Sequence, residues 1–308
     1  VSSPRELVQR AAELGWDALG LTDHQSLAAA VQFTLACREF SVKPIIGAEV
    51  SVEAAPSGAG VSPPPWADPS GAGVSPPPWA DPSGAGSRDG IWKLPTGPFS
   101  IDSSYHLTLL APNATAYACL CRMLSEAGLR DEKSRAKVSW ESLQRWGGSL
   151  IALTGCLRGE LPTAILKGDL ARAEKIVLCY REIFGDSLFL EIQNHGLKEE
   201  FIVEEALLRL GKKHGIAAVA SQNVHYARPG DYLLRDVSTA IRHRVSLEEA
   251  GGLIPWSSKY HLRSPSEMEA IFRHRPGLLE QASLIADSVD FALDALDFSI
   301  PEPWGQGR

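Results

Sequence analysis

Apolar positions along the chain follow two periodicities, which predict alternating helices and strands. Ser3-Pro4-Arg5-Glu6 has the capping-box pattern, and Leu7, Ala11 and Leu14 follow at helical spacing, so we expect a helix over 4–14. Short apolar runs bounded by glycine or polar residues predict six strands, at 17–22, 44–52, 105–110, 149–154, 187–192 and 216–221. Helical patterns lie between most of them, at 26–40, 113–127, 169–184 and 198–213.

This alternation predicts the fold class. Strands separated by helices of 12 to 17 residues are typical of right-handed βαβ units, so we expect an α/β fold with a parallel sheet, open or closed into a barrel. A barrel would need one more strand before Val1, and we expect sequence to be missing upstream. Short helices dominate from about Asp231, including 265–274 and 276–288. We therefore expect a barrel domain at 1–230 and a helical linker at 231–308 toward something larger.

A proline- and glycine-rich repeat interrupts the barrel region. Residues 57–69 recur identically at 70–82, and a third copy begins at Ser83. Proline and glycine at this density cannot pack a core, so we expect a disordered insertion at 54–90 within a surface hairpin. A polyproline ligand for an aromatic groove is the alternative.

Composition narrows the classes of function. A net charge of −7 over 308 residues argues against an autonomous nucleic-acid-binding domain held by a basic surface. Five cysteines without paired Cys-x-x-Cys spacing suit a reducing compartment, and neither a membrane span nor a signal peptide is visible, so we expect a cytoplasmic protein without a membrane partner. The sequence has no Walker A loop and no Gly-x-Gly-x-x-Gly after a strand, which argues against nucleotide binding by those routes.

Polar side chains at strand edges carry the functional signal. His24 closes the first predicted strand and Glu49 closes the apolar run of the second, so both are expected at the C-terminal rim of a βα-barrel. Zinc and harder divalent metals both accept such a mixed set of ligands. Four further strand-edge positions join them: His106, Cys156, Asn223 and His225. His106 opens its strand rather than closing it, which a simple parallel barrel does not predict.

Three of these candidates also have an ordinary structural interpretation. His24 could cap a helix, Glu49 could be a surface carboxylate and Cys156 could be a small buried hydrophobe. A nucleophilic Cys156 paired with His225 is a second chemical interpretation, but nothing resembling an oxyanion loop accompanies it. We expect His195 to be structural. We expect four histidines in helical or basic stretches to be solvated: His214, His243, His261 and His274.

Six motifs in fixed order resemble a known family. They are Ala18-Leu-Gly-Leu-Thr-Asp-His24, Lys43-Pro-Ile-Ile-Gly-Ala-Glu49, His106-Leu-Thr-Leu-Leu-Ala111, Leu153-Thr-Gly-Cys156, Glu191-Ile-Gln-Asn-His-Gly196 and Ala220-Ser-Gln-Asn-Val-His-Tyr226. Together they resemble the PHP (polymerase and histidinol phosphatase) domain, most closely the N-terminal PHP domain of bacterial C-family DNA polymerases. The stretches 236–242, 247–251 and 261–268 resemble the segment that links that domain to the polymerase core. The resemblance covers nearly the whole chain outside 54–90.

The resemblance implies a distorted (β/α)7 PHP barrel, here without its first strand, with divalent metals such as zinc or manganese at the rim. Matched motif by motif, six residues fall on metal-ligand positions: His24, Glu49, His106, Cys156, Asn223 and His225. The family's opening His-x-His motif and a following acidic ligand would precede Val1. Asn223 stands where aspartate is usual, and a neutral amide binds a divalent ion less strongly, so we expect an incomplete site.

The activity implied is metal-dependent phosphoester hydrolysis, as in proofreading or pyrophosphate removal, within an alpha-type polymerase that is replicative or error-prone. The carboxylates that polymerise nucleotides would lie beyond Arg308, so DNA would be a partner through the absent polymerase core, as would other replication or translesion proteins. Two alternatives remain open: a catalytically inactive structural or docking module, and a free-standing PHP phosphatase. The tail over 231–304 favours the polymerase context.

Overall fold

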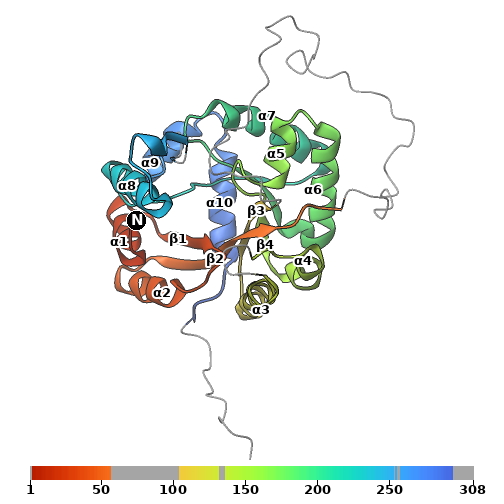
Figure 1. The fold of residues 1–308 in the computed structure, drawn as a ribbon. Coiled ribbons are helices and arrows are strands. Elements are labelled where there is room, and N and C mark those ends of the chain that lie inside the picture. The colour runs from red at the N-terminus through yellow and green to blue at the C-terminus, as the bar shows by residue number, and fades with distance from the viewer. Residues whose placement is uncertain (1, 57–103, 132–135, 253, 255–256, 294–308) are drawn as a thin grey trace, which may run out of the picture.

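A computed structural model describes residues 2–56, 104–131, 136–252, 254 and 257–293. Six strands form one curled sheet in the order β1-β2-β3-β4-β5-β6, with helices around it (Figure 1). The strands are β1 (Ala18–His24), β2 (Lys43–Val52), β3 (Tyr105–Leu110), β4 (Ile151–Leu153), β5 (Leu188–Ile192) and β6 (Ala218–Ala220). The predicted α/β class is confirmed. The repeat copies, from residue 57 onward, lie outside the described residues.

Most of the helices lie close to the predicted ranges. They are α1 (Pro4–Leu14), α2 (Ala30–Glu39), α3 (Ala114–Arg130), α4 (Trp140–Trp146), α5 (Glu160–Leu166), α6 (Leu170–Phe184), α7 (Lys198–His214), α8 (Tyr232–His243), α9 (Pro265–Ile271) and α10 (Gly277–Ser288), with 3-10 turns at η1 (Gly147–Ser149), η2 (Gly185–Ser187), η3 (Pro229–Asp231) and η4 (Glu249–Gly252). The sequence analysis gave no range for α4, α5 or α8. Two of these, α4 and α5, have 7 residues, which leaves little room for a helical period to register, and α9, of the same length, was predicted only as part of the longer range 265–274.

The predicted capping box sets the start of the described chain. The Ser3 amide donates to Glu6 Oε2 at 2.7 Å, and Gly15 ends α1 with a left-handed φ of +84°. The buried face of α1 packs with Phe33 and Cys37 of α2. This packing fixes the helix that precedes β1 against the helix that follows it.

One strand runs against the predicted direction. β1–β2, β4–β5 and β5–β6 are parallel pairs, but β3 is antiparallel to both β2 and β4. The expectation of a wholly parallel sheet is therefore wrong at β3. Parallel pairing of β2 with β3 would need a crossover connection, and the repeat-rich sequence between them has no helical pattern to supply one. Because β3 runs backwards, its first residues lie at the rim where β1 and β2 end, which explains the position of His106.

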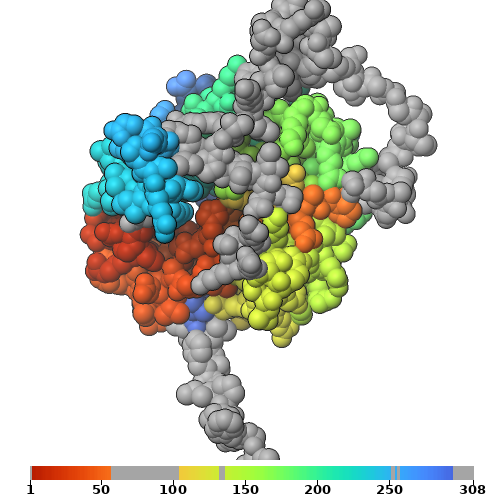
Figure 2. Space-filling model, viewed as in Figure 1, coloured from red at the N-terminus to blue at the C-terminus, as the bar shows by residue number. Residues whose placement is uncertain are grey.

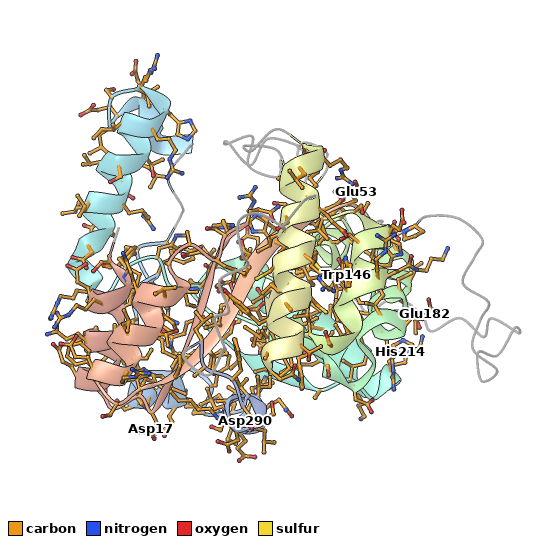
Figure 3. The ribbon with its side chains drawn as sticks, turned by 90° about the horizontal axis from the view of Figure 1, so that it is seen from below. Asp17, Glu53, Trp146, Glu182, His214 and Asp290 are labelled. Atoms are coloured by element: carbon orange, nitrogen blue, oxygen red, sulfur yellow. The ribbon has the colours of Figure 1, made fainter. Side chains whose placement is uncertain are left out.

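The two ends of the sheet differ in character. Figure 3 shows Asp17, which precedes β1, and Asp290, which follows α10, at one end, with Glu53, which follows β2, toward the other. At the Asp17 end, α10 packs against β6, and Ile45, Val219 and Ile285 belong to one apolar cluster. The rim at the end of β1 and β2 is instead lined with polar groups. The apolar closure at one end leaves the other end for chemistry.

Helix α8 exposes apolar side chains and buries an arginine. Its apolar side chains Leu233, Leu234, Val237 and Ile241 are 43% to 71% exposed, whereas Arg235 is 6% exposed. The Arg235 guanidinium lies over the rings of Tyr226 and Tyr260, 5.5 and 5.9 Å from their centroids. Figure 2 shows this cyan region of the surface beside the red N-terminal helix. In the part of the chain that the structure describes, no helix is both long and apolar enough to cross a membrane.

Candidate metal centre

Three side chains from adjacent strands meet at the rim. His24 ends β1, Glu49 lies in β2 and His106 lies near the start of β3, and their ligand atoms all fall within 4.8 Å of one another. Glu49 Oε1 is 2.8 Å from His24 Nδ1 and 2.5 Å from His106 Nδ1. The two imidazole rings are 5.0 Å apart at an angle of 67°. The sequence-predicted pair His24 and Glu49 is thus brought together with His106.

Strand pairing accounts for this convergence. In the parallel β1–β2 ladder His24 is the register partner of Glu49, and in the antiparallel β2–β3 ladder Glu49 lies opposite Thr108, two residues from His106. Side chains two residues apart in a strand point to the same face, so His106 and Thr108 share a face. Directly after His24, Gln25 takes a φ of +50°, uncommon outside glycine, and its amide donates to the Glu49 carbonyl at 2.9 Å. The chain therefore turns away and leaves His24 at the rim.

The cluster is buried at its centre. Glu49 is 8% and His106 5% exposed, so the alternative of an ordinary surface carboxylate is wrong for Glu49. Burial alone would raise the pKa of Glu49, but the imidazoles of His106 and His24 together hold that pKa well below its usual range. The same carboxylate raises the pKa of His24, while burial lowers the pKa of His106. Glu49 is therefore ionised and His106 is held in its neutral form.

The donor set fits a divalent cation. Among the described residues, Glu49 Oε1 has no hydrogen bond of good geometry, although two ring nitrogens lie close to it. Buried carboxylate oxygens normally have hydrogen-bond partners, so an oxygen without one beside two further ligand atoms is the arrangement that an ion would satisfy. Two imidazoles and a carboxylate match the ligands of zinc and of manganese.

Cys156 is not a member of the convergent group of three but contacts it through His106. Its Sγ lies 3.5 Å from His106 Nδ1, in the turn that follows β4. Gly155 adopts a φ of +86°, and a Cβ there would lie 2.4 Å from the His106 carbonyl oxygen, so only glycine allows this turn to approach β3. Burial raises the pKa of the Cys156 thiol, which argues against the nucleophilic alternative. The thiol also contacts His106 rather than His225, the partner that alternative required.

Asn223 and His225 lie in the loop after β6, and His225 is not a member of the convergent group of three. The His225 amide donates to the Tyr260 carbonyl at 2.8 Å, and the two rings meet edge to face at 5.2 Å. Burial lowers the pKa of His225 to about 4, and the positive charge of nearby His24 lowers it further. His225 is therefore neutral near pH 7. Asn223 is half-buried two residues earlier on the same loop.

The remaining histidines separate into structural and solvated ones. His195 is 2% exposed, its Nδ1 lies 2.6 Å from Glu200 Oε1, and its ring stacks on Tyr260 at 4.2 Å, as expected for a structural residue. His243 and His274 are exposed, and His261 is half-buried. The expectation of a solvated His214 is wrong, because this last residue of α7 is buried with its Nε2 2.9 Å from Glu174 of α6.

Sequence reasoning missed two residues beside the rim. Glu191 of β5 is a buried carboxylate, and Tyr260 packs between His195 and His225. A signal for Glu191 was present, because it is the one charged residue in the apolar run over 188–192. Tyr260 had no comparable signal, since its contacts join loops far apart in the chain.

Comparison with known proteins identifies the family. The PHP domain matches residues 1–195. The chain belongs to the PHP domain family. This match confirms the resemblance to the PHP domain that the sequence motifs indicated.

The similar curated proteins are DNA polymerases. DNA polymerase III subunit alpha of Treponema pallidum is 31% identical over 286 residues, covering 92% of this chain and 22% of the relative. The Thermus aquaticus protein of the same name is 32% identical over 255 residues, covering 82% and 18%. The error-prone DNA polymerase of Mycobacterium tuberculosis is 30% identical over 303 residues, covering 97% and 24%. The chain therefore spans about a fifth of the length of these relatives.

A solved structure resembles the fold more distantly. An amidohydrolase from Chromobacterium violaceum is 13% identical with a TM-score of 0.42, and the match covers 71% of this chain and 81% of that one.

Proposed function

We propose that this chain is the PHP portion of an alpha-type bacterial DNA polymerase and that its rim binds a divalent metal for phosphoester hydrolysis. The observation that carries the proposal is the convergence of the His24, Glu49 and His106 ligand atoms on one side of the Glu49 carboxylate. Membership of the PHP family supports it. DNA would reach the protein through the polymerase portion that the relatives possess, and the setting would be the cytoplasm.

The polymerase context is favoured over a free-standing phosphatase. The family match ends at residue 195, whereas the polymerase relatives align over 82% to 97% of the chain. The two alignments that cover 92% and 97% of the chain therefore include much of the helical segment from Asp231 onward. A small-molecule phosphatase has no need of that segment, and the domain division at about residue 230 remains part of the proposal.

The chain's own residues would divide the work at the rim. His24, Glu49 and His106 would bind the ion, and Cys156 would add a thiolate, a set that favours zinc over magnesium or calcium. A divalent ion bound there would polarise a phosphoryl oxygen and lower the pKa of water. The loop residues Asn223 and His225 would complete the shell, and His225 is already in the neutral form that a ligand requires.

We expect hydrolysis by this chain to be weak. Glu49 is the one carboxylate among the six proposed ligands, and Asn223 supplies no charge. With Glu49 and the Cys156 thiolate as its anionic ligands, a divalent ion there would have less of its charge offset than in a site where residue 223 is also a carboxylate. The alternative is a structural module that binds a metal ion but has no hydrolytic activity.

The test measures metal binding and hydrolysis together. The chain is stripped with a chelator, titrated with zinc or manganese by calorimetry, and assayed on end-labelled single-stranded DNA and on p-nitrophenyl phosphate. We expect binding of a metal by the wild type, a loss of ~10-fold or more in Glu49→Gln, and no loss in Glu53→Gln, a more exposed glutamate four residues along the same segment. No binding by the wild type would refute the metal centre. Binding without any hydrolysis would favour the structural module.

A further inference from the structure

Glu191 is a buried carboxylate beneath the rim with an unusual set of neighbours. It is 5% exposed, and four groups donate toward its two oxygens. Oε2 accepts from the Gly155 amide at 2.9 Å and lies 3.5 Å from Thr108 Oγ1, while Oε1 accepts from Gln193 Nε2 at 2.9 Å and from Ser221 Oγ. The Glu191 amide in turn donates to Thr154 Oγ1 at 2.9 Å. One side chain thereby joins β3, the turn after β4, β5 and the loop after β6.

The donors stand beside the proposed ligands in sequence. Thr108 is the register partner of Glu49 and lies two residues from His106. Gly155 immediately precedes Cys156, and Ser221 lies two residues before Asn223 and four before His225. At β3, β4 and β6, a proposed ligand therefore lies within two residues of a residue that donates a hydrogen bond to Glu191, and at β2 the ligand Glu49 lies opposite such a residue. No other carboxylate at the rim has this property among the described residues.

The charge of Glu191 is not offset by a cationic side chain. Among the described residues, no lysine, arginine or histidine forms an ion pair with it, and its donors are all neutral. The nearby Glu49 carboxylate raises the pKa of Glu191 further, beyond the effect of burial. Two carboxylates in one buried region repel each other unless a cation lies close by.

We propose that Glu191 is a positioning residue of the metal centre, which holds the Cys156 turn and the Asn223–His225 loop around the ion without touching it. This inference rests on the proposed metal centre. Hydrogen-bond partners beyond the ligands typically control metal affinity by ~10- to 100-fold, because they fix where the ligands point. Glu191 adds a negative charge behind a ligand set that contains a single carboxylate.

Glu160 offers a matched control elsewhere in the fold. It is 4% exposed and also accepts several hydrogen bonds, from the Ala55 amide at 3.0 Å and from Arg172 at 2.7 Å. Its charge is offset by Arg172, and its contacts tie α5 and α6 to the end of β2. Replacing either glutamate by glutamine removes one buried carboxylate, although only at Glu160 does the change leave a cationic partner, Arg172, behind. Only the Glu191 change is expected to alter the metal centre.

The experiment uses Co²⁺ as the probe with the complete 308-residue chain. Cobalt reports cysteine ligation through a thiolate charge-transfer absorption band, and competition with a chelator gives its affinity. We expect Glu191→Gln to bind Co²⁺ ~10- to 100-fold more weakly and to lose most of the thiolate band, while Glu160→Gln keeps both. Thermal midpoints of both variants are measured without metal, so that a general loss of stability is separated from a loss at the rim.

The outcomes distinguish this inference from the proposed function. Wild-type affinity and an intact thiolate band in Glu191→Gln would overturn the role of Glu191 while leaving the metal centre in place. Absence of Co²⁺ binding by the wild type would overturn the metal centre and this role together. If Glu191→Gln does not fold, Ser221→Ala is tested in its place. Ser221 is half-buried, and its substitution removes only one of the hydrogen bonds to Glu191. A several-fold weaker affinity in Ser221→Ala supports the inference, and wild-type affinity contradicts it.

Discussion

The two halves of the rim are held in place by different forces. In the half formed by β1, β2 and β3, the ligand atoms of His24, Glu49 and His106 converge within 4.8 Å through ladder register alone. In the half formed by β4, β5 and β6, the candidate residues lie in turns beyond the strand ends. Cys156 touches the cluster through His106, and His225 packs on Tyr260. Main-chain ladders position side chains directly, whereas the turns are held in place by contacts with other side chains, such as those of Glu191 and Tyr260.

The two halves also differ in charge. The ladder half contains an ionised Glu49 whose pKa is held down by two imidazoles. In the turn half, burial raises the pKa of the Cys156 thiol and lowers that of His225 to about 4, so both side chains are neutral near pH 7. The ladder half can therefore attract a cation by itself, and the turn half would respond after the cation arrives.

The largest expected effect comes from removing one histidine from each half. We expect His106→Ala to weaken zinc binding by ~100-fold or more, because it removes a ligand that the β2–β3 ladder already holds beside Glu49. We expect His225→Ala to weaken it by roughly tenfold. Calorimetric titration of both variants with zinc provides the comparison. Equal losses of zinc affinity would show that the ladder half and the turn half contribute alike to metal binding.

A negative charge added to the turn half should strengthen metal binding. We expect Asn223→Asp to tighten zinc or manganese binding by roughly tenfold, equal to ~1.4 kcal/mol, because a carboxylate binds a divalent ion more strongly than an amide. Gln222→Glu is the control, since it adds the same charge one residue away at a side chain that accepts from the Arg263 amide. Tighter binding in both variants would point to a general electrostatic effect rather than to ligation by residue 223. With an upstream segment that carries the family's opening motif, Asn223→Asp should also raise phosphoesterase turnover.

Burial of neutral His225 should make the stability of the turn half depend on pH. The pKa of His225 is about 4 when folded and about 6.5 when unfolded, so between these values the unfolded chain binds more protons. Stability is therefore lost as pH falls from about 6.5 toward 4, by roughly 1–2 kcal/mol between pH 7 and pH 5. Urea denaturation with chelator present should show this fall in the wild type and a smaller one in His225→Asn. Parallel pH profiles would exclude His225 as the cause.

Local periodicity was sufficient to predict most of the fold. All six strands and most of the long helices followed from period and caps, and His24 and Glu49 followed from the rule that parallel strands end at one rim. The direction of β3 depends on its pairing partners, which no local pattern specifies. For the same reason, burial of His214 against α6 and the contacts of Tyr260 were beyond the sequence. Glu191 was visible as a charged residue in an apolar run, but its four donors come from segments up to 83 residues away.

The smallest expected effect concerns the repeat-rich connection between β2 and β3. If ladder hydrogen bonds alone fix Glu49 against His106, shortening this connection should leave the ladder half unchanged. Deleting residues 57–82 should alter the thermal midpoint little, because closure entropy changes by only ~0.6 kcal/mol per doubling of loop length. Zinc affinity should also match that of the wild type. A markedly weaker affinity, or loss of folding, would show that the repeat supports β2 and β3. The ladder half would then depend on contacts outside its own strands, as the turn half does.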